Sequence, residues 1–254
     1  MKRVSQEHGS FVLASNDEAA VFAEYQRHYA QSPLPPDEVL PNLGMFLTSK
    51  NLARILFFND IYQMIVHHHG IVMEFGVRWG QTLSLLSALR GIYEPFNRHR
   101  KIVGFDTFCG FQGVSEVDGP SSGCKEGAFS VTADYRSYLE KLMVLQEAVN
   151  PIAHLRKFEL VEGDASQSVP DYLTSHPETI VSLAIFDFDI YQPTRAALEA
   201  IVPYLTKGSV LVFDELCDSY FPGETVALRE VLGLRQLRIQ RSPHTARVSY
   251  VVLD

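Results

Sequence analysis

The sequence predicts an α/β domain built on a mostly parallel sheet, with helices on both faces and an antiparallel hairpin at its end. Three observations support this fold class. Short apolar runs alternate with helical stretches along most of the 254 residues. The last two apolar runs follow each other without an intervening helix. The length suits one such domain with additions, so no second large domain is expected.

The N-terminal part is predicted to be a helical arm outside the sheet. A helix over about residues 16–30 ends at the proline-rich segment 31–37, because proline lacks an amide donor and restricts the residue before it. Residues 48–66 form another helix, whose apolar residues recur with a period near 3.6. We therefore divide the chain into an arm that caps the substrate side, 1–47, and a sheet domain, 48–254.

Five apolar runs are expected to form parallel strands, because helical stretches connect them. These strands are 70–75, 101–105, 158–162, 181–186 and 209–213. The connecting helices are expected at about 80–91, 133–149, 166–175, 192–205 and 223–233. The runs 236–240 and 247–253 flank a turn with a proline and form the terminal hairpin, which gives seven strands. Ligands of such sheets bind beyond the carboxyl ends of the strands.

Composition and charge exclude several classes of protein. The formal net charge is −8, which disfavours nucleic acid and anionic membranes as partners. The longest nearly apolar run, 181–186, is too short to span a bilayer, and the N-terminal residues lack the apolar stretch of a secretory signal. The three cysteines are scattered and form no CxxC pair. We therefore expect a cytoplasmic globular protein without a nucleic-acid or membrane partner.

The first strand runs into a turn with glycines at positions 76 and 80. Glycine permits a tight turn and close approach to a ligand, and the helix that opens near Gly80 offers free amides to a carboxylate. The spacing G-x-x-x-G differs from the dinucleotide-binding G-x-G-x-x-G. Glu74 ends a buried strand and needs a polar partner there. The alternative is a structural turn with a paired glutamate.

Acidic residues also follow the second and third strands. Asp106 lies about 30 residues after the glycine turn, where it can accept hydrogen bonds from two ribose hydroxyls. Asp164 follows the third strand and has two interpretations. It contacts the edge of an adenine, or it caps the next helix, as aspartate often does.

The strongest signal is a group of four acids after the next two strands: Asp187, Asp189, Asp214 and Glu215. Adjacent parallel strands would bring these carboxylates to one edge of the sheet. Two unit charges about 4 Å apart repel by about 4 kcal/mol at a surface-like dielectric constant. The group therefore needs protons, basic partners or a cation, and neither motif contains Lys or Arg. Oxygen ligands of this kind favour Mg²⁺, while helix caps and solvated turn acids are the alternative.

Taken together, these strand ends resemble the macrocin-type (TylF-like) sugar O-methyltransferases, a branch of the class I S-adenosylmethionine-dependent enzymes. The likeness covers roughly residues 45–230. The motifs that carry it are 74–80, 104–108, 187–194, 214–215 and 221–227. The resemblance implies a single Rossmann-like class I methyltransferase domain over residues 48–254.

The resemblance also implies roles for individual residues. Those that would bind S-adenosylmethionine are Glu74, Gly76, Val77, Gly80, Thr82, Asp106, Thr107, Phe108, Gly163, Asp164, Ala165 and Asp187. Asp187, Asp214 and Glu215 would ligate Mg²⁺, and Asp189 would be the general base. The family often has two aspartates where this chain has Asp214 and Glu215, so the longer Glu215 side chain would ligate from further out or through water.

The implied function is Mg²⁺-dependent methylation of a sugar hydroxyl. The acceptor would be a deoxysugar of natural-product, antibiotic biosynthesis, either nucleotide-linked or already attached to the product. One alternative is a catechol-like acceptor, although such enzymes usually place a lysine near the base, where this chain has Asp189-Ile190-Tyr191. A non-catalytic S-adenosylmethionine-binding protein is another. A short-chain reductase is excluded, because the chain lacks Tyr-x-x-x-Lys. The apolar arm predicts a homo-oligomer.

Overall fold

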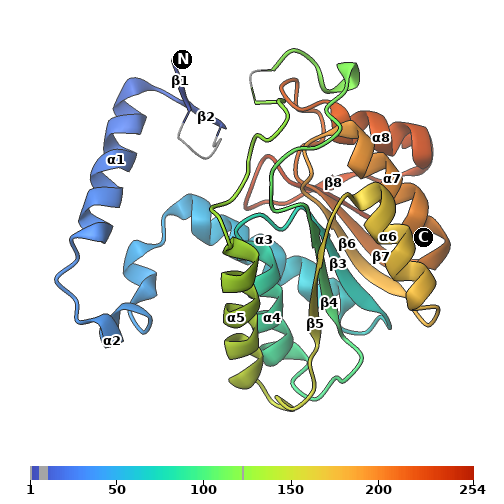
Figure 1. Ribbon diagram of the computed structural model, residues 1–254, viewed down its shortest axis with the longest axis horizontal. Helices are drawn as coiled ribbons and strands as arrows, with labels where there is room; N and C mark the ends of the chain where they lie inside the picture. The colour runs from blue at the N-terminus through green and yellow to red at the C-terminus, as the bar shows by residue number, and fades with distance from the viewer. Residues whose placement is uncertain (1, 6–10, 122) are drawn as a thin grey trace.

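The computed structural model describes residues 2–5, 11–121 and 123–254, and its main body is a twisted sheet between two layers of helices (Figure 1). The seven strands of this sheet follow the order β5-β4-β3-β6-β7-β9-β8. The parallel strands are β3 (Ile71–Phe75), β4 (Ile102–Asp106), β5 (Phe158–Glu162), β6 (Val181–Phe186) and β7 (Leu205–Phe213). The antiparallel strands are β8 (Gln240–Arg241) and β9 (Ser249–Val252). The predicted fold class is confirmed.

Three helices pack on each face of the sheet. One face carries α3 (Ser49–Ile65), α4 (Gln81–Tyr93) and α5 (Tyr135–Ala148). The other carries α6 (Ala165–Ser175), α7 (Tyr191–Ile201) and α8 (Gly223–Val231). The chain moves from β3 outward to β5 and then crosses back to β6, which lies on the other side of β3. This reversal opens a crevice above β3 and β6, where ligands of open α/β sheets bind.

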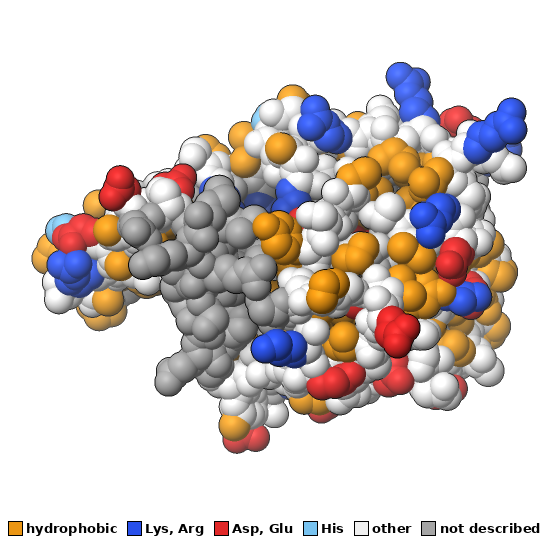
Figure 2. Space-filling model, turned by 90° about the horizontal axis from the view of Figure 1, so that it is seen from above, with side chains coloured by type: hydrophobic (Ala, Val, Ile, Leu, Met, Phe, Trp, Pro, Cys, Tyr) orange, Lys and Arg blue, Asp and Glu red, His pale blue; other side chains and the backbone are white. Residues whose placement is uncertain are grey.

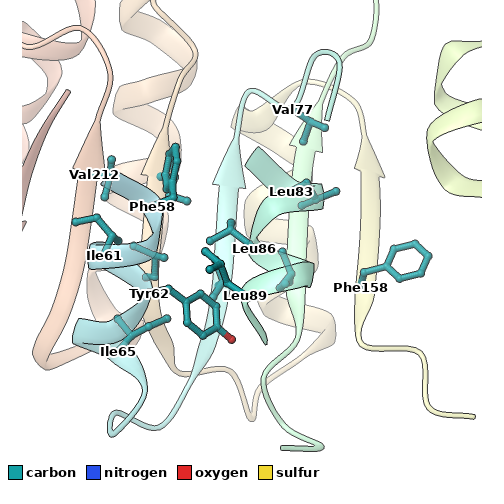
Figure 3. Packing of buried hydrophobic residues seen from close by; sticks show 14 of the residues in the cluster. Phe58, Ile61, Tyr62, Ile65, Val77, Leu83, Leu86, Leu89, Phe158 and Val212 are labelled. Carbon is teal, nitrogen blue, oxygen red and sulfur yellow. The ribbon is translucent and has the colours of Figure 1, made fainter. Parts of the chain in front are cut away.

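The core divides into two apolar clusters, one on each face of the sheet. In the cluster of Figure 3, Phe58, Ile61 and Ile65 form a stripe along α3, and Leu86 of α4 packs beside them. The spacing of this stripe follows the helical period, so one face of α3 is buried against the sheet. Burial of these side chains holds α3 against the sheet.

Arg100 forms a buried polar centre at the opposite end of the sheet. Its side chain is 1% exposed, and its Nε donates to Glu94 Oε2 at 2.8 Å. A second nitrogen donates to Ser182 Oγ at 2.6 Å, and Glu94 also accepts from the hydroxyl of Tyr62 at 2.7 Å. The guanidinium also donates to three backbone carbonyls, those of Ile65, His68 and Gly70. One charged side chain therefore ties α3, β3 and β6 together.

The N-terminal arm lies beside the main body (Figure 1). Its helix α1 (Asn16–Ala30) begins at a capping box, in which Ser15 and Glu18 exchange hydrogen bonds, and it coincides with the predicted helix. The short helices α2 (Pro36–Val39) and η1 (Leu43–Phe46) follow. Two strands were not predicted: β1 (Lys2–Ser5) and β2 (Phe11–Ala14) pair antiparallel. Runs of four residues are too short for periodicity to reveal.

Two further differences from the sequence prediction concern the edge of the sheet. The strand expected at 236–240 is reduced to β8, which pairs with β9 over two residues only, and η4 (Leu234–Gln236) precedes it. β7 begins at Leu205, four residues earlier than expected. Within the part of the chain that the structure describes, no helix is long and apolar enough to cross a bilayer.

Candidate active site

A cavity of about 460 Å³ opens at the carboxyl ends of β3, β4, β6 and β7. The helix α3 contributes Lys50, Asn51 and Arg54 to its wall, and the loop after β4 contributes Phe111 and Gln112. Figure 2 views the molecule from this side, and basic side chains lie recessed there between the arm and the main body. The cavity occupies the crevice that the strand order creates.

The glycine turn after β3 brings the backbone close to β6. Gly76 has φ +97°, and a Cβ at this position would lie 2.0 Å from the carbonyl oxygen of Asp187. Gly80 has φ +73°, and α4 begins there without a side-chain cap. The first amides of α4 therefore stay available for an anion beside the cavity.

Asp106 joins the turns that follow β3 and β4. Its Oδ2 accepts from the backbone amide of Arg78 at 2.7 Å, and its Oδ1 accepts from that of Phe108 at 2.6 Å. Both of these neighbours have positive φ, +48° and +55°. Burial raises the pKa of Asp106, although these amide hydrogen bonds oppose the shift. The carboxylate lines the cavity and keeps lone pairs for further donors.

We predict that Asp106→Ala weakens binding of S-adenosylmethionine by about 1.5–3 kcal/mol, the usual loss for hydrogen bonds to a charged group. Calorimetric titration with S-adenosylhomocysteine measures this loss. Because Ala also removes the support of both turns, the titration is repeated with an analogue that lacks the ribose hydroxyls. If Asp106 binds the ribose, the two deletions are not additive. Additive losses would mean that Asp106 only shapes the turns.

Most of the predicted donor-binding residues line this one cavity. Those that do are Glu74, Gly76, Val77, Thr82, Asp106, Thr107, Asp164, Ala165 and Asp187. Gly80, Phe108 and Gly163 do not line the cavity. A Cβ on Gly80 would strike Leu139, Phe108 packs against the apolar core, and the amide of Gly163 donates to the carbonyl oxygen of Asp106 at 3.0 Å. Asp164 caps α6 by accepting from the amide of Ser166 at 2.9 Å, which is the helix-cap role that the sequence offered for it. Its side chain also lies at the cavity wall.

Glu74 is buried at the floor of the cavity, with 1% of its surface exposed. Its Oε2 has no hydrogen-bond partner among the described residues, contrary to the expectation that a buried acid is paired. Burial and the nearby Asp187 raise the pKa of Glu74 well above its usual value, although Arg54 opposes this shift. A buried acceptor that faces a cavity suits a ligand with a donor group.

The four strand-end acids meet, as the sequence predicts, but arginines from distant segments accompany them. Arg54 of α3 donates to Asp187 Oδ2 and to Asp214 Oδ1, both at 3.0 Å. Arg247, just before β9, donates to Glu215 Oε2 at 2.9 Å and also contacts its other oxygen. Basic partners therefore partly balance the repulsion between the acids. They are one of the three possibilities that the sequence left open, beside protons and a bound cation.

Asp189 lines the same cavity as these acids but takes part in none of the ion pairs just described. It has φ +62°, and its backbone amide donates to Glu224 Oε1 at 3.4 Å. Its Oδ1 is buried without a hydrogen-bond partner among the described residues. Burial, followed by the charges of Asp187 and Asp214, raises the pKa of Asp189 well above its usual value. A carboxylate with a raised pKa is a stronger base than an ordinary aspartate.

The fit of a metal differs among the three predicted ligands. Asp187 and Asp214 offer carboxylate oxygens at adjacent strand ends, which is the donor type that Mg²⁺ prefers. Glu215 is 1% exposed, and Arg247 contacts both of its oxygens. Among the described residues, no three His, Cys, Asp or Glu side chains form an arrangement that could hold a metal ion. The donor chemistry of two acids therefore suits a hard cation, while Arg54 holds those two acids in this arrangement.

Sequence reasoning missed three residues of the site. Arg54 and Arg247 lie far along the chain from the acids that they pair with, and buried Glu224 accepts from the amides of Asp189 and Glu215. Glu224 falls within the motif 221–227, and Arg54 also had a signal in the sequence. It stands four residues before Phe58 and so continues the buried stripe of α3, a position where an arginine needs an acidic partner.

The strand order, the antiparallel β7–β9 pair and the cavity at the strand ends define a class I methyltransferase. Similar solved structures agree. A crystal structure of CalS11, described as a calicheamicin methyltransferase, is 39% identical over 99% of this chain and 98% of that chain, with a TM-score of 0.92. An apo structure of CalS11, described as a TDP-rhamnose 3′-O-methyltransferase of calicheamicin biosynthesis, is 37% identical over 97% and 99%, with a TM-score of 0.84. The chain belongs to the macrocin-type (TylF-like) family of S-adenosylmethionine-dependent sugar O-methyltransferases, and it is an enzyme.

The O-methyltransferase NovP shares the fold alone, with 14% identity over 79% of each chain and a TM-score of 0.59. No model of a known protein family matches the chain, and no curated protein matches it either.

Proposed function

We propose that this enzyme transfers a methyl group from S-adenosylmethionine to a hydroxyl of a nucleotide-linked deoxysugar in natural-product biosynthesis, and that the reaction depends on Mg²⁺. The related CalS11 is described as acting on TDP-rhamnose, which supports a sugar of this class. The observation that carries the proposal is the position of Asp189. Its Oδ1, which has no hydrogen-bond partner among the described residues, is buried beside the Asp187–Arg54–Asp214 group, in the cavity suited to the donor.

The donor is proposed to bind with its amino-acid end between β3 and α4. The first turn of α4, which has no side-chain cap, offers amides to the carboxylate. Glu74 Oε2, which has no partner within the described part of the chain, accepts from the ammonium group. Asp106 accepts from the ribose hydroxyls. Asp164 and Ala165 lie beside the adenine at the start of α6. Gly80, Phe108 and Gly163 are proposed to shape the turns that hold this site.

Asp189 is proposed to remove the proton of the acceptor hydroxyl as the methyl group transfers. Its raised pKa, caused first by burial and then by Asp187 and Asp214, favours proton uptake during the reaction. The methyl group of the sulfonium is already activated. In-line placement of the hydroxyl therefore supplies much of the remaining acceleration.

Asp187 and Asp214 are proposed to hold Mg²⁺, with Glu215 contributing only if Arg247 releases it. When bound, Mg²⁺ would lower the pKa of the acceptor hydroxyl and orient it. The support is electrostatic, because six acidic side chains cluster here: Glu74, Asp187, Asp189, Asp214, Glu215 and Glu224. Arg54 and Arg247 form ion pairs with three of them, Asp187, Asp214 and Glu215.

The test uses labelled S-adenosylmethionine and a panel of nucleotide-linked deoxysugars, with phenolic acceptors as a second panel. We expect a methylated sugar in the presence of Mg²⁺. We also expect a chelator to abolish turnover and added Mg²⁺ to restore it. Full activity in excess chelator would refute the metal dependence, and methylation of phenols alone would refute the sugar acceptor.

We propose further that the arm over residues 1–47 caps the acceptor side and contacts a second copy of the chain. Its support is the exposure of large apolar residues in this part of the molecule, including Val21 (67%) and Met45 (63%). Light scattering of the purified protein measures the oligomeric state, and a monomer at micromolar concentration would contradict this contact.

A further inference from the structure

Arg54 connects two parts of the active-site cavity. Its side chain is 25% exposed, and Nη1 donates to Asp214 Oδ1 while Nη2 donates to Asp187 Oδ2, each at 3.0 Å. The same Nη2 donates to Thr82 Oγ1 at 3.0 Å. Thr82 lies in the first turn of α4, the part of the cavity assigned to the amino-acid end of the donor. One guanidinium therefore joins the strand-end acids to the donor site.

The oxygens that Arg54 holds are those that a divalent cation would need. A guanidinium between Asp187 and Asp214 occupies the space between these two carboxylates, and it repels a second cation at short range. Without any cation, the two partly buried carboxylates would repel each other. Arg247 Nε also lies 3.7 Å from Asp214 Oδ2, but the oxygens between the two acids are held by Arg54. A metal bound between Asp187 and Asp214 would therefore compete with Arg54 for the same oxygens.

A displaced Arg54 needs another anion, because a partly buried guanidinium without one is costly. Its position limits the choice. The guanidinium carbon lies 5.1 Å from the centre of the Phe58 ring, and the side chain already reaches Thr82. The carboxylate of S-adenosylmethionine is the anion expected beside Thr82, and arginine pairs with carboxylates through two parallel hydrogen bonds.

We propose that Arg54 is an exchangeable counterion: it neutralises Asp187 and Asp214 until a divalent metal displaces it, and it then binds the carboxylate of S-adenosylmethionine. This inference rests on the proposed function, which supplies the metal and the donor. Linkage requires that each of the two ligands then tightens the binding of the other. Arg54 is a binding and positioning residue in this scheme, and it takes no part in proton transfer.

Calorimetric titrations with Mg²⁺ and with S-adenosylhomocysteine test the proposal without turnover. We expect Arg54→Met to bind Mg²⁺ about ten-fold more tightly than the wild type, because its competitor is gone. In the wild type, saturating Mg²⁺ should tighten S-adenosylhomocysteine binding by about five-fold or more, within the usual range of coupling. In Arg54→Met this coupling should disappear.

Two variants serve as controls. Arg54→Lys keeps the charge but cannot bridge two carboxylates with a planar fork. Its affinity for Mg²⁺ should therefore lie between those of the wild type and Arg54→Met. Lys50→Met removes a positive charge one turn earlier on α3, from a side chain that lines the cavity without an ion pair among the described residues. It should change Mg²⁺ affinity little. Thermal melting by circular dichroism shows whether each variant is folded. If Arg54→Met does not fold, the comparison of Arg54→Lys with the wild type still tests the proposal.

The outcomes separate this inference from the proposed function. If the wild type and Arg54→Met bind Mg²⁺ equally, the metal dependence stands and the competition is refuted. If Arg54→Met binds Mg²⁺ more tightly but keeps the coupling to S-adenosylhomocysteine, the transfer of Arg54 to the donor carboxylate is refuted. If neither protein binds Mg²⁺, the proposed metal dependence fails, and the exchange fails with it.

Discussion

Replacing Asp189 with Asn is expected to slow the methyl-transfer step by about 10²–10⁴-fold, the usual contribution of general-base catalysis. The side chain keeps nearly the same size and loses its ability to accept a proton. Its Oδ1 is buried without a hydrogen-bond partner among the described residues, so the change removes no hydrogen bond to that oxygen. Affinity for the donor should remain close to that of the wild type. Single-turnover rates and a donor titration on the same preparation measure both quantities.

The pH dependence gives a second measurement of Asp189. A base must be ionised to act, so the wild-type rate should rise with pH through the raised pKa of Asp189. Asp189→Asn should lose this limb of the profile. Asp187→Asn is the matched comparison, since it should weaken Mg²⁺ binding instead. If Asp189→Asn keeps the rate but loses metal affinity, Asp189 is a metal ligand and another group is the base.

Replacing Arg100 with Met is expected to lower the free energy of unfolding by about 3–5 kcal/mol, as for other broken buried ion pairs. The change leaves Glu94 without its guanidinium partner and removes donors from Ser182 and three backbone carbonyls. Although burial opposes it, hydrogen bonds from Arg100 and Tyr62 hold the pKa of Glu94 below its usual value. This contribution to stability is therefore present above pH about 4.5 and is lost as the pH falls through the lowered pKa.

Urea denaturation measures the loss, with Arg136→Met as the control. Arg136 forms an ion pair with Glu162 at the surface, where the two side chains are 39% and 56% exposed, so its loss should cost less than about 1 kcal/mol. Arg100→Met combined with Glu94→Leu should recover part of the stability, because no buried charge then lacks a partner. Equal effects of Arg100→Met and Arg136→Met would mean that the buried centre contributes no more than a surface pair.

The sequence was sufficient for the strands and for the acids at their ends. Periodicity located β3 to β7 because each strand is a short apolar run between helices, and the run Val181–Phe186 has the predicted bounds. The strand ends carry Glu74, Asp106 and Asp187, and these side chains line one cavity because parallel strands end at the same edge of the sheet. Local pattern and chain direction determine these features, so no knowledge of packing is needed.

Features that depend on long-range contact could not be predicted in this way. The β1–β2 pair and the short β8 depend on pairing over few residues, where periodicity carries no information. Glu224 accepts from the amides of Asp189 and Glu215, but the motif 221–227 by itself does not indicate which groups this side chain contacts. Burial by neighbouring elements, rather than local pattern, decides which of these residues belong to the site.

By itself, the sequence determined the fold class and the positions of the acids, because both follow from local periodicity and from the common direction of parallel strands. Only the tertiary structure decided how the charges of those acids are balanced. Arg54 comes from α3, which precedes the first strand of the main sheet, and Arg247 comes from the segment just before β9, the last strand. Their partners lie 160 and 32 residues away, so the packing of α3 and β9 on the sheet creates the ion pairs. Coulomb interactions depend on distance in space, and chain separation does not encode that distance.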